Sequence, residues 1–228
     1  MPFLCQLTSR NWNVKMIDLY TWNTPNGRKA AIMLEELGVP YLIKPINIST
    51  GEQKEASYTT INPNGRIPAI YDHDNQNRVF ESGAILIYLA EKHKRFIPSE
   101  PKQKAEALGW LFWQASGLGP IVGQFNHFNS LNESNNYSLA RFRDESLRLL
   151  TVLNKHLAQN KYIAGNEYTI ADIINYTWVD TAFNGALNQN SEFQKMFEAT
   201  NEWKNKLAQR PAVVTAIDKL STLNTSKY

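Results

Sequence analysis

The sequence predicts a small α/β domain followed by an all-helical domain. Strand-like and helix-like segments alternate up to about residue 90, whereas only helical periodicity follows Lys104. Between them, the stretch from Lys94 to Gln103 is charged and contains two prolines, which is typical of a linker. We therefore expect an extension at residues 1–15, an α/β domain at residues 16–95 and a helical domain at residues 104–222.

Composition narrows the classes of function. With 43% apolar residues, a chain of 228 residues can bury a sizeable core. The net charge of +3 comes from 24 basic and 21 acidic residues without a long run of one sign, which gives no electrostatic case for nucleic acid or a membrane as partner. The sequence contains no run of eighteen apolar residues, so we expect no membrane-spanning helix.

Cysteine and histidine usage argues against disulfides and metals. Cys5 is the single cysteine, so an internal disulfide and a C-x-x-C motif are excluded, and a reducing, cytoplasmic location is expected. The four histidines show no pair spaced four apart and no H-E-x-x-H motif, so we expect no metal site.

The first half of the α/β domain has the pattern of a βαβ unit. Residues 16–20 alternate between apolar and polar as a half-buried strand does, and residues 28–37 carry apolar residues at helical spacing. Gly38 and Pro40 end this helix, and residues 41–46 form the next predicted strand. Such units are normally right-handed with parallel strands.

The second half is predicted as strand, strand and helix. Residues 49–62 are polar and expected to be irregular, and strands follow at residues 66–71 and 79–80. Because proline has no N–H, Pro68 must begin a strand or lie at an edge. A cis Ile67-Pro68 bond would turn the Ile67 backbone outward, where a ligand could pair with it, but the sequence does not decide this.

The helical domain is predicted from repeated apolar stripes. Pro120 should kink or break a first helix, which starts at Lys104, near Gly119, and a second helix should run over residues 137–158. Thr169 and Asp172 form a capping-box-like helix start, and two further helices are expected around residues 203–207 and 211–220.

A polar turn at residues 20–27, between the first strand and the first helix, could hold an anion. The first backbone N–H groups of a helix are unpaired and favour negative charge, and Thr24 and Asn26 add a hydroxyl and an amide that can donate. The same residues are also good turn and N-cap chemistry without any function. From the turn alone, this second explanation is the better one.

Motifs beyond the turn change that balance. Arg66-Ile67-Pro68-Ala69-Ile70 and Glu81-Ser82-Gly83-Ala84-Ile85-Leu86 resemble the cis-proline and acidic-serine segments of the cytosolic glutathione transferases, whose N-terminal domain is thioredoxin-like (βαβ-ββα) and precedes an all-helical domain. Thr24-Pro25-Asn26-Gly27, Leu111-Phe112-Trp113-Gln114 and Gly117-Leu118-Gly119-Pro120 are similar to the bacterial nu-class enzymes and their fungal relatives, which are glutathione-dependent disulfide-bond reductases. The resemblance covers roughly residues 16–220.

The resemblance implies a site for glutathione as co-substrate. Glu81 would pair with the α-amine of its γ-glutamyl group, Ser82 would hold the α-carboxylate, and Ile67 would clamp the cysteine backbone. Gln53 would face the glycyl end, and Arg141 would add a charge from the helical domain of the same or a second subunit. Taken singly, each of these could be an ordinary surface or helix-end residue.

Thr24 and Asn26 would contact the thiol and stabilise its thiolate, so they are the expected catalytic residues, and Asn26 also binds glutathione. Conjugating classes place Tyr or Ser there, so the resemblance favours disulfide reduction, with organic peroxide reduction as a minor activity. Conjugation of electrophiles and a non-catalytic, regulatory glutathione-binding protein are the alternatives. A homodimer is also implied. Asp172 is expected to support folding, and no catalytic role is assigned to His127.

Overall fold

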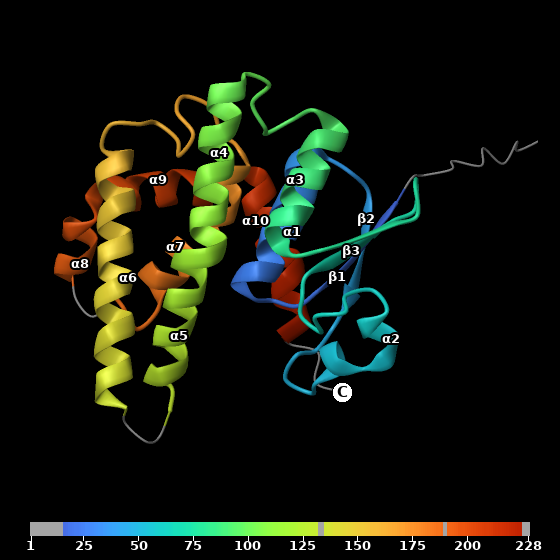
Figure 1. Cartoon of the computed structure of the whole chain (residues 1–228), viewed down its shortest axis with the longest axis horizontal. Coiled ribbons are helices and arrows are strands. Elements are labelled where there is room, and N and C mark those ends of the chain that lie inside the picture. Colours follow the sequence, from blue (N-terminus) through green and yellow to red (C-terminus); the bar gives the residue numbers. More distant parts are fainter. Residues whose placement is uncertain (1–15, 132–134, 189–190, 225–228) are drawn as a thin grey trace, which may run out of the picture.

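The computed structural model describes residues 16–131, 135–188 and 191–224, and has an α/β domain beside a helical domain (Figure 1). This confirms the predicted fold class. The expected extension at residues 1–15, including Cys5, lies outside the described residues. In the described segments, no helix is both long and apolar enough to cross a membrane.

The sheet has four strands in the order β2-β1-β3-β4. Its strands are β1 (Ile17–Thr21), β2 (Tyr41–Pro45), β3 (Ala69–Asp72) and β4 (Asn77–Phe80). β1 pairs parallel with β2 and antiparallel with β3, which confirms the βαβ unit followed by a hairpin. β3 starts three residues later than the predicted strand, because Pro68, which has no N–H to donate, comes just before it.

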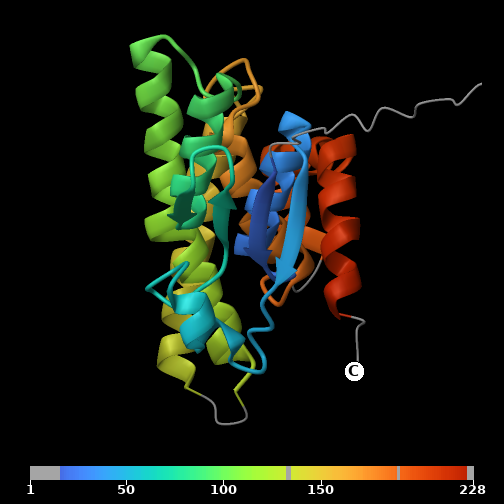
Figure 2. The same cartoon turned by 90° about the vertical axis from the view of Figure 1, so that its right-hand side faces the viewer.

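Helices α1 (Pro25–Leu37) and α3 (Ser82–His93) lie between the sheet and the helical domain (Figure 1), and Figure 2 shows the sheet in front of them. Pro25 occupies the first turn of α1, and Gly38 ends it in the left-handed conformation with φ 68°. Because α1 contacts α3, α7 and α10, most of its circumference is buried.

Residues 49–62 were expected to be irregular, and this is wrong in part. They contain a 3₁₀ turn, η1 (Glu52–Lys54), and a single helical turn, α2 (Ala56–Thr59). The Glu55 carbonyl accepts from the backbone N–H groups of Tyr58 and Thr59 at 3.1 and 2.9 Å. The ring of Tyr58 is buried and its hydroxyl donates to the Arg66 carbonyl at 2.6 Å, so one aromatic anchors an otherwise polar segment.

The helical domain starts with α4 (Pro101–Trp113), three residues before the predicted Lys104, because the Glu100 carboxylate caps the N–H groups of Lys102 and Gln103. A π-helical segment, η2 (Gln114–Leu118), then leads into α5 (Gly119–Asn129), so the expected kink or break near Gly119 takes the form of a π-helical turn within a continuous helical path. α6 (Asn136–Leu157) follows.

The centre of the helical domain is α7 (Ile170–Asn184), which is buried on most sides. Its capping box is confirmed: the Thr169 hydroxyl accepts from Ala171 N–H, and the Asp172 carboxylate accepts from Thr169 N–H. The chain continues through α8 (Ser191–Met196), which was not predicted, then α9 (Glu198–Ala208), α10 (Pro211–Ser221) and the short η3 (Thr222–Asn224).

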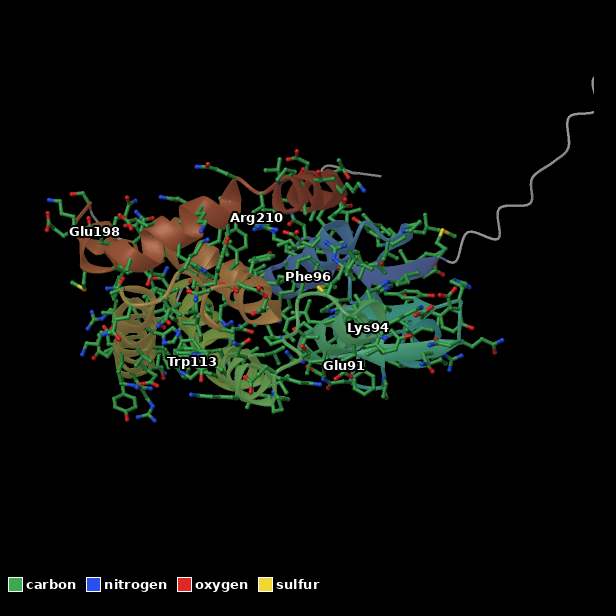
Figure 3. All side chains as sticks on the ribbon, turned by 90° about the horizontal axis from the view of Figure 1, so that it is seen from above. Glu91, Lys94, Phe96, Trp113, Glu198 and Arg210 are labelled. Carbon is green, nitrogen blue, oxygen red and sulfur yellow. The ribbon has the colours of Figure 1, made fainter. Side chains whose placement is uncertain are left out.

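The two domains are joined by a cluster around Arg210, which Figure 3 labels together with Phe96 near the domain junction. The Arg210 guanidinium donates to both carboxylate oxygens of Glu36 in α1, at 2.6 and 2.8 Å, and lies 3.9 Å from the ring centre of Tyr168. The Phe96 carbonyl accepts from the backbone N–H of Ile170 at 2.8 Å. These contacts fix the helical domain against α1.

Candidate active site

A cleft of about 680 Å³ lies where the two domains meet. Its walls come from the start of α1, the start of α3 and the segment before β3 on one side, and from α4, η2, α5 and α7 on the other. The polar residues that line it include Asn26, Lys29, Arg66, Glu81, Ser82 and Gln114. Asn26, Glu81 and Ser82, which were expected to bind glutathione, are thus in one cleft with Lys29, which was not an expected site residue.

The opening turn places Thr24 at the N-cap of α1. The Thr24 hydroxyl oxygen accepts from Gly27 N–H at 3.1 Å, and within the described part of the chain its own O–H has no acceptor and can donate to a ligand. Gly27 is required because a Cβ there would lie 2.2 Å from the Trp22 carbonyl oxygen and 2.4 Å from the Thr21 hydroxyl. The tight turn therefore presents a hydroxyl donor at the N-terminus of a helix.

Asn26 is held through its side-chain oxygen. Asn26 Oδ1 accepts from Lys29 Nζ at 2.9 Å and from Trp178 Nε1 at 2.8 Å. Among the described residues, no protein acceptor takes the Asn26 Nδ2 hydrogens. The amide is therefore available as a donor to a ligand in the cleft.

Lys29 is the principal group that sequence reasoning missed. It is 1% exposed, and its ammonium faces Asn26 Oδ1, Ser82 Oγ at 3.4 Å and Gln114 Oε1 at 2.7 Å. Burial lowers the pKa of Lys29 to about 7, and the Glu81 carboxylate partly opposes this. A signal was present, since Lys29 lies three and four residues before Ile32 and Met33 on the buried side of α1.

Glu81 and Ser82 form the start of α3. Glu81 has φ 68°, a left-handed conformation that is costly for a residue with a Cβ, and its exposed carboxylate accepts from Asn64 Nδ2 at 3.3 Å. Ser82 opens the helix beside Lys29. A carboxylate in the mouth of the cleft next to a helix N-terminus can receive an amine and a carboxylate side by side.

The segment before β3 contains the cis peptide bond at Ile67-Pro68 that the sequence left open. The preceding carbonyl, that of Arg66, accepts from Tyr58 Oη at 2.6 Å and from Asn62 Nδ2 at 2.5 Å, which fixes the entry to this segment. Ile67 is half-buried there. The Tyr58 and Asn62 side chains therefore fix the backbone immediately before Ile67.

Gln53 lies in η1 beside the turn at Gly65, where a Cβ would be 3.0 Å from the Gln53 carbonyl oxygen. Its side-chain oxygen is buried and has no hydrogen-bond partner among the described residues. A buried polar atom without a partner is uncommon, and a ligand donor would satisfy it.

Arg141 is not brought into this cleft. It is exposed on α6 and lines a separate hollow with Tyr137, Asp144 and Arg148. Within one chain, the structure therefore separates Arg141 from the other expected glutathione residues. Among the described residues, no cluster of three or more His, Cys, Asp or Glu is placed to hold a metal ion.

Comparison with known proteins gives two family matches. Residues 16–91 match the N-terminal domain of glutathione S-transferases, and residues 118–211 match their C-terminal domain. The chain is 40% identical over 210 residues to the disulfide-bond oxidoreductase YfcG of Escherichia coli K12, which covers 90% of this chain and 95% of that protein.

Solved structures agree in fold. The glutathione transferase URE2P6 of Phanerochaete chrysosporium, crystallised with oxidized glutathione, is 36% identical with a TM-score of 0.86, covering 92% of this chain and 98% of the other. A glutathione transferase of Pseudomonas putida, with one glutathione disulfide bound per subunit, is 32% identical with a TM-score of 0.84, covering 91% and 93%.

Proposed function

The chain belongs to the glutathione S-transferase family, and from this premise we propose that it is a glutathione-dependent disulfide-bond oxidoreductase. Two glutathione molecules reduce one disulfide. The thiolate of the first attacks one sulfur of the substrate disulfide, which forms a mixed disulfide with glutathione and releases one substrate thiolate. The second attacks the glutathione sulfur of that mixed disulfide, giving glutathione disulfide and the other thiol. Each released thiolate takes up one proton.

The observation that carries this proposal is the donor pair at the start of α1. In the segments that the structure describes, the Thr24 O–H and the Asn26 Nδ2 hydrogens have no acceptor, and they lie at a helix N-terminus near a buried lysine. These groups favour an anion, and neither Thr24 nor Asn26 can act as a nucleophile at neutral pH without a base. The arrangement suits a thiolate that the ligand itself supplies.

The protein's own thiol has no part in this reaction. Cys5, the only cysteine, lies before the folded motif and has no second cysteine with which to cycle as a dithiol. In keeping with this assignment, the reaction belongs in a reducing compartment, and we place it in the cytoplasm.

Around the thiol, the remaining polar groups fit the ends of the tripeptide. Glu81 is assigned to the α-amine and Ser82, with the N-terminus of α3, to the α-carboxylate. The Ile67 backbone is assigned to the cysteine residue of glutathione. Gln53, with its unpartnered side-chain oxygen, is assigned to the backbone near the glycyl end.

Two assays decide between this function and its alternatives. We expect glutathione-dependent reduction of a small dialkyl disulfide to be much faster than conjugation to an aryl halide, with organic peroxide reduction as a minor activity. The matched control is Cys5→Ser, which should keep wild-type turnover. Faster conjugation would make the protein a conjugating transferase, turnover of neither substrate would leave a binding protein, and loss of activity in Cys5→Ser would show a protein thiol at work.

Arg141 enters the proposal through a homodimer. Since it lies outside the cleft of its own chain, its charge can serve glutathione only from a second copy whose helical domain faces this cleft. Sedimentation at micromolar concentration should then give twice the 26.1 kDa chain mass. A persistent monomer would remove Arg141 from the site.

A further inference from the structure

The side chain of Asn26 is anchored from both domains. Lys29 reaches it from the next turn of α1, and Trp178 reaches it from α7, 152 residues away in the chain. An indole Nε1–H can only donate, so the Asn26 atom facing it at 2.8 Å must be the oxygen. This settles which end of the amide faces the protein and leaves Nδ2 for the cleft.

The indole ring of Trp178 packs against two glycines of α5. A Cβ on Gly119 would lie 3.2 Å from Trp178 Nε1, and a Cβ on Gly123, one turn later, would lie 3.2 Å from the far edge of the indole ring. The two glycines let the indole pack directly on the helix backbone and extend to Asn26. Larger residues there would push the ring away from that hydrogen bond.

The Lys29 side chain is also fixed by several polar contacts. Its Nζ lies within hydrogen-bond distance of three side chains, one of them Gln114 Oε1 at 2.7 Å, and Gln114 is itself 0% exposed. An amine donates to Asn26 Oδ1 whether it is charged or neutral. The lysine therefore supports the same amide orientation on either side of its pKa.

We propose that Lys29 and Trp178 are positioning residues that fix the Asn26 amide, so that its Nδ2 hydrogens face the glutathione thiolate. The inference rests on the proposed function in that glutathione is the ligand. Because Trp178 belongs to the helical domain, the thiol site is complete only when the two domains are docked.

The test is the thiol pKa of bound glutathione, followed by ultraviolet thiolate absorbance, in Trp178→Phe and Lys29→Met. Trp178→Phe keeps every charged group around the cleft: Lys29 on α1, Glu81 at the start of α3, Arg66 before β3, and the Arg28–Asp180 pair on α1 and α7. We expect each variant to have a thiolate fraction at neutral pH about three- to tenfold below wild type, with kcat/KM lowered in proportion. At pH above the raised thiol pKa, the rates should converge on wild type.

The matched control is Trp110→Phe, which removes an indole hydrogen bond to Glu106 at 2.8 Å outside the cleft and should leave the thiol pKa unchanged. A double-mutant cycle separates positioning from general packing. In an Asn26→Ala background, Trp178→Phe, which removes no charge, should have little further effect on the thiol pKa.

An unchanged thiol pKa in folded Trp178→Phe, or an equal loss with and without Asn26, would overturn the proposal. If Lys29→Met does not fold, Trp178→Phe still decides. The pKa measurement needs glutathione but no disulfide, so failure of the wild type to reduce disulfides would count against the proposed function and not against this assignment.

Discussion

Lys29 carries an amine into a position that is 1% exposed, at the point where α1, α3 and η2 meet. In solution a lysine ammonium is strongly hydrated, so burial favours its neutral form and lowers its pKa to about 7. The Asn26 and Gln114 side-chain oxygens and the Ser82 hydroxyl replace part of the lost water. The residue therefore binds fewer protons in the folded chain than in the unfolded chain above neutral pH.

A pH dependence of stability follows from this lowered pKa. From about pH 7 up to about pH 10 the unfolded chain binds more protons at Lys29, so the wild-type free energy of unfolding should rise with pH by up to a few kcal/mol relative to Lys29→Met. Below about pH 7, where both states are protonated, the difference between the two proteins should be flat. Urea denaturation of the wild type and of Lys29→Met at several pH values across this range measures the difference in the free energy of unfolding.

The control for this experiment is Lys104→Met. Lys104 pairs with Glu91 at the exposed surface, at 2.8 Å, so its removal takes away a lysine without opening a buried site. A Lys29→Met difference that stays flat from pH 7 to pH 10 would show that Lys29 titrates in the folded protein as it does in water.

At the scale of the elements, the start of α7 organises the helical domain. Asp172 is fully buried and accepts from Thr169 N–H at 2.9 Å, Ile163 N–H at 3.0 Å and Trp203 Nε1 at 2.9 Å. Burial raises the pKa of Asp172, while these hydrogen bonds act against that shift. One carboxylate thus connects α7 to α9 and to the loop that precedes α7.

Asp172→Ala should be strongly destabilising. It leaves three buried N–H donors without an acceptor, each costing roughly 1–3 kcal/mol, so a loss of about 3 kcal/mol or more is expected. Asp144→Ala, on the exposed side of α6, is the matched control and should change stability by less than about 0.5 kcal/mol. Thermal or urea unfolding that finds similar losses for the two would contradict the assigned role.

The elements differ in how far their sequence determines them. The capping box at Thr169 and the helix stop at Gly38 are local signals, and the structure has both, whereas the signal at Pro120 marks only a π-helical turn just before it. α2 and α8 were missed because each is very short, and in α2 stability depends on one buried tyrosine rather than on a periodic stripe.

At the scale of the whole molecule, Arg210 forms a polar contact across the junction between the two domains. Its guanidinium binds Glu36 through two parallel hydrogen bonds and stacks on Tyr168, so removing it would leave a Glu36 side chain that is only 7% exposed without its charged partner. The pKa of Arg210 is raised, first by the hydrogen bond to Glu36, so it stays charged.

Arg210→Ala should therefore lower the free energy of unfolding by about 2–4 kcal/mol, after allowance for the partial exposure of the pair. Arg210→Lys keeps the charge but loses the two-pronged geometry and the stacking, so it should fall between wild type and alanine. Urea unfolding midpoints measure both. An Arg210→Lys protein as stable as wild type would reduce the junction to simple charge pairing.

In the candidate site, the sequence did not predict contacts between residues that are far apart in the chain. Thr24, Asn26, Ile67, Glu81 and Ser82 belong to short local motifs, and the resemblance of those motifs to a known family nominated them. Trp178 could not be nominated, since it meets Asn26 only through the docking of two domains. Lys29 was passed over because a lysine on a helix is usually exposed, and only the packing of α1 on three sides buries it.

The central claim, that the opening turn stabilises a glutathione thiolate, is tested most directly by titrating bound glutathione through its ultraviolet thiolate absorbance. A free thiol has a pKa near 8.5, and two donors plus a helix N-terminus should lower it by about one to a few units in the wild type. Thr24→Ala and Asn26→Ala should each move it back upward, with falling disulfide turnover at neutral pH. If both variants bind glutathione yet keep the wild-type thiol pKa and rate, the segment is only a turn, and catalysis does not depend on thiolate stabilisation by Thr24 and Asn26.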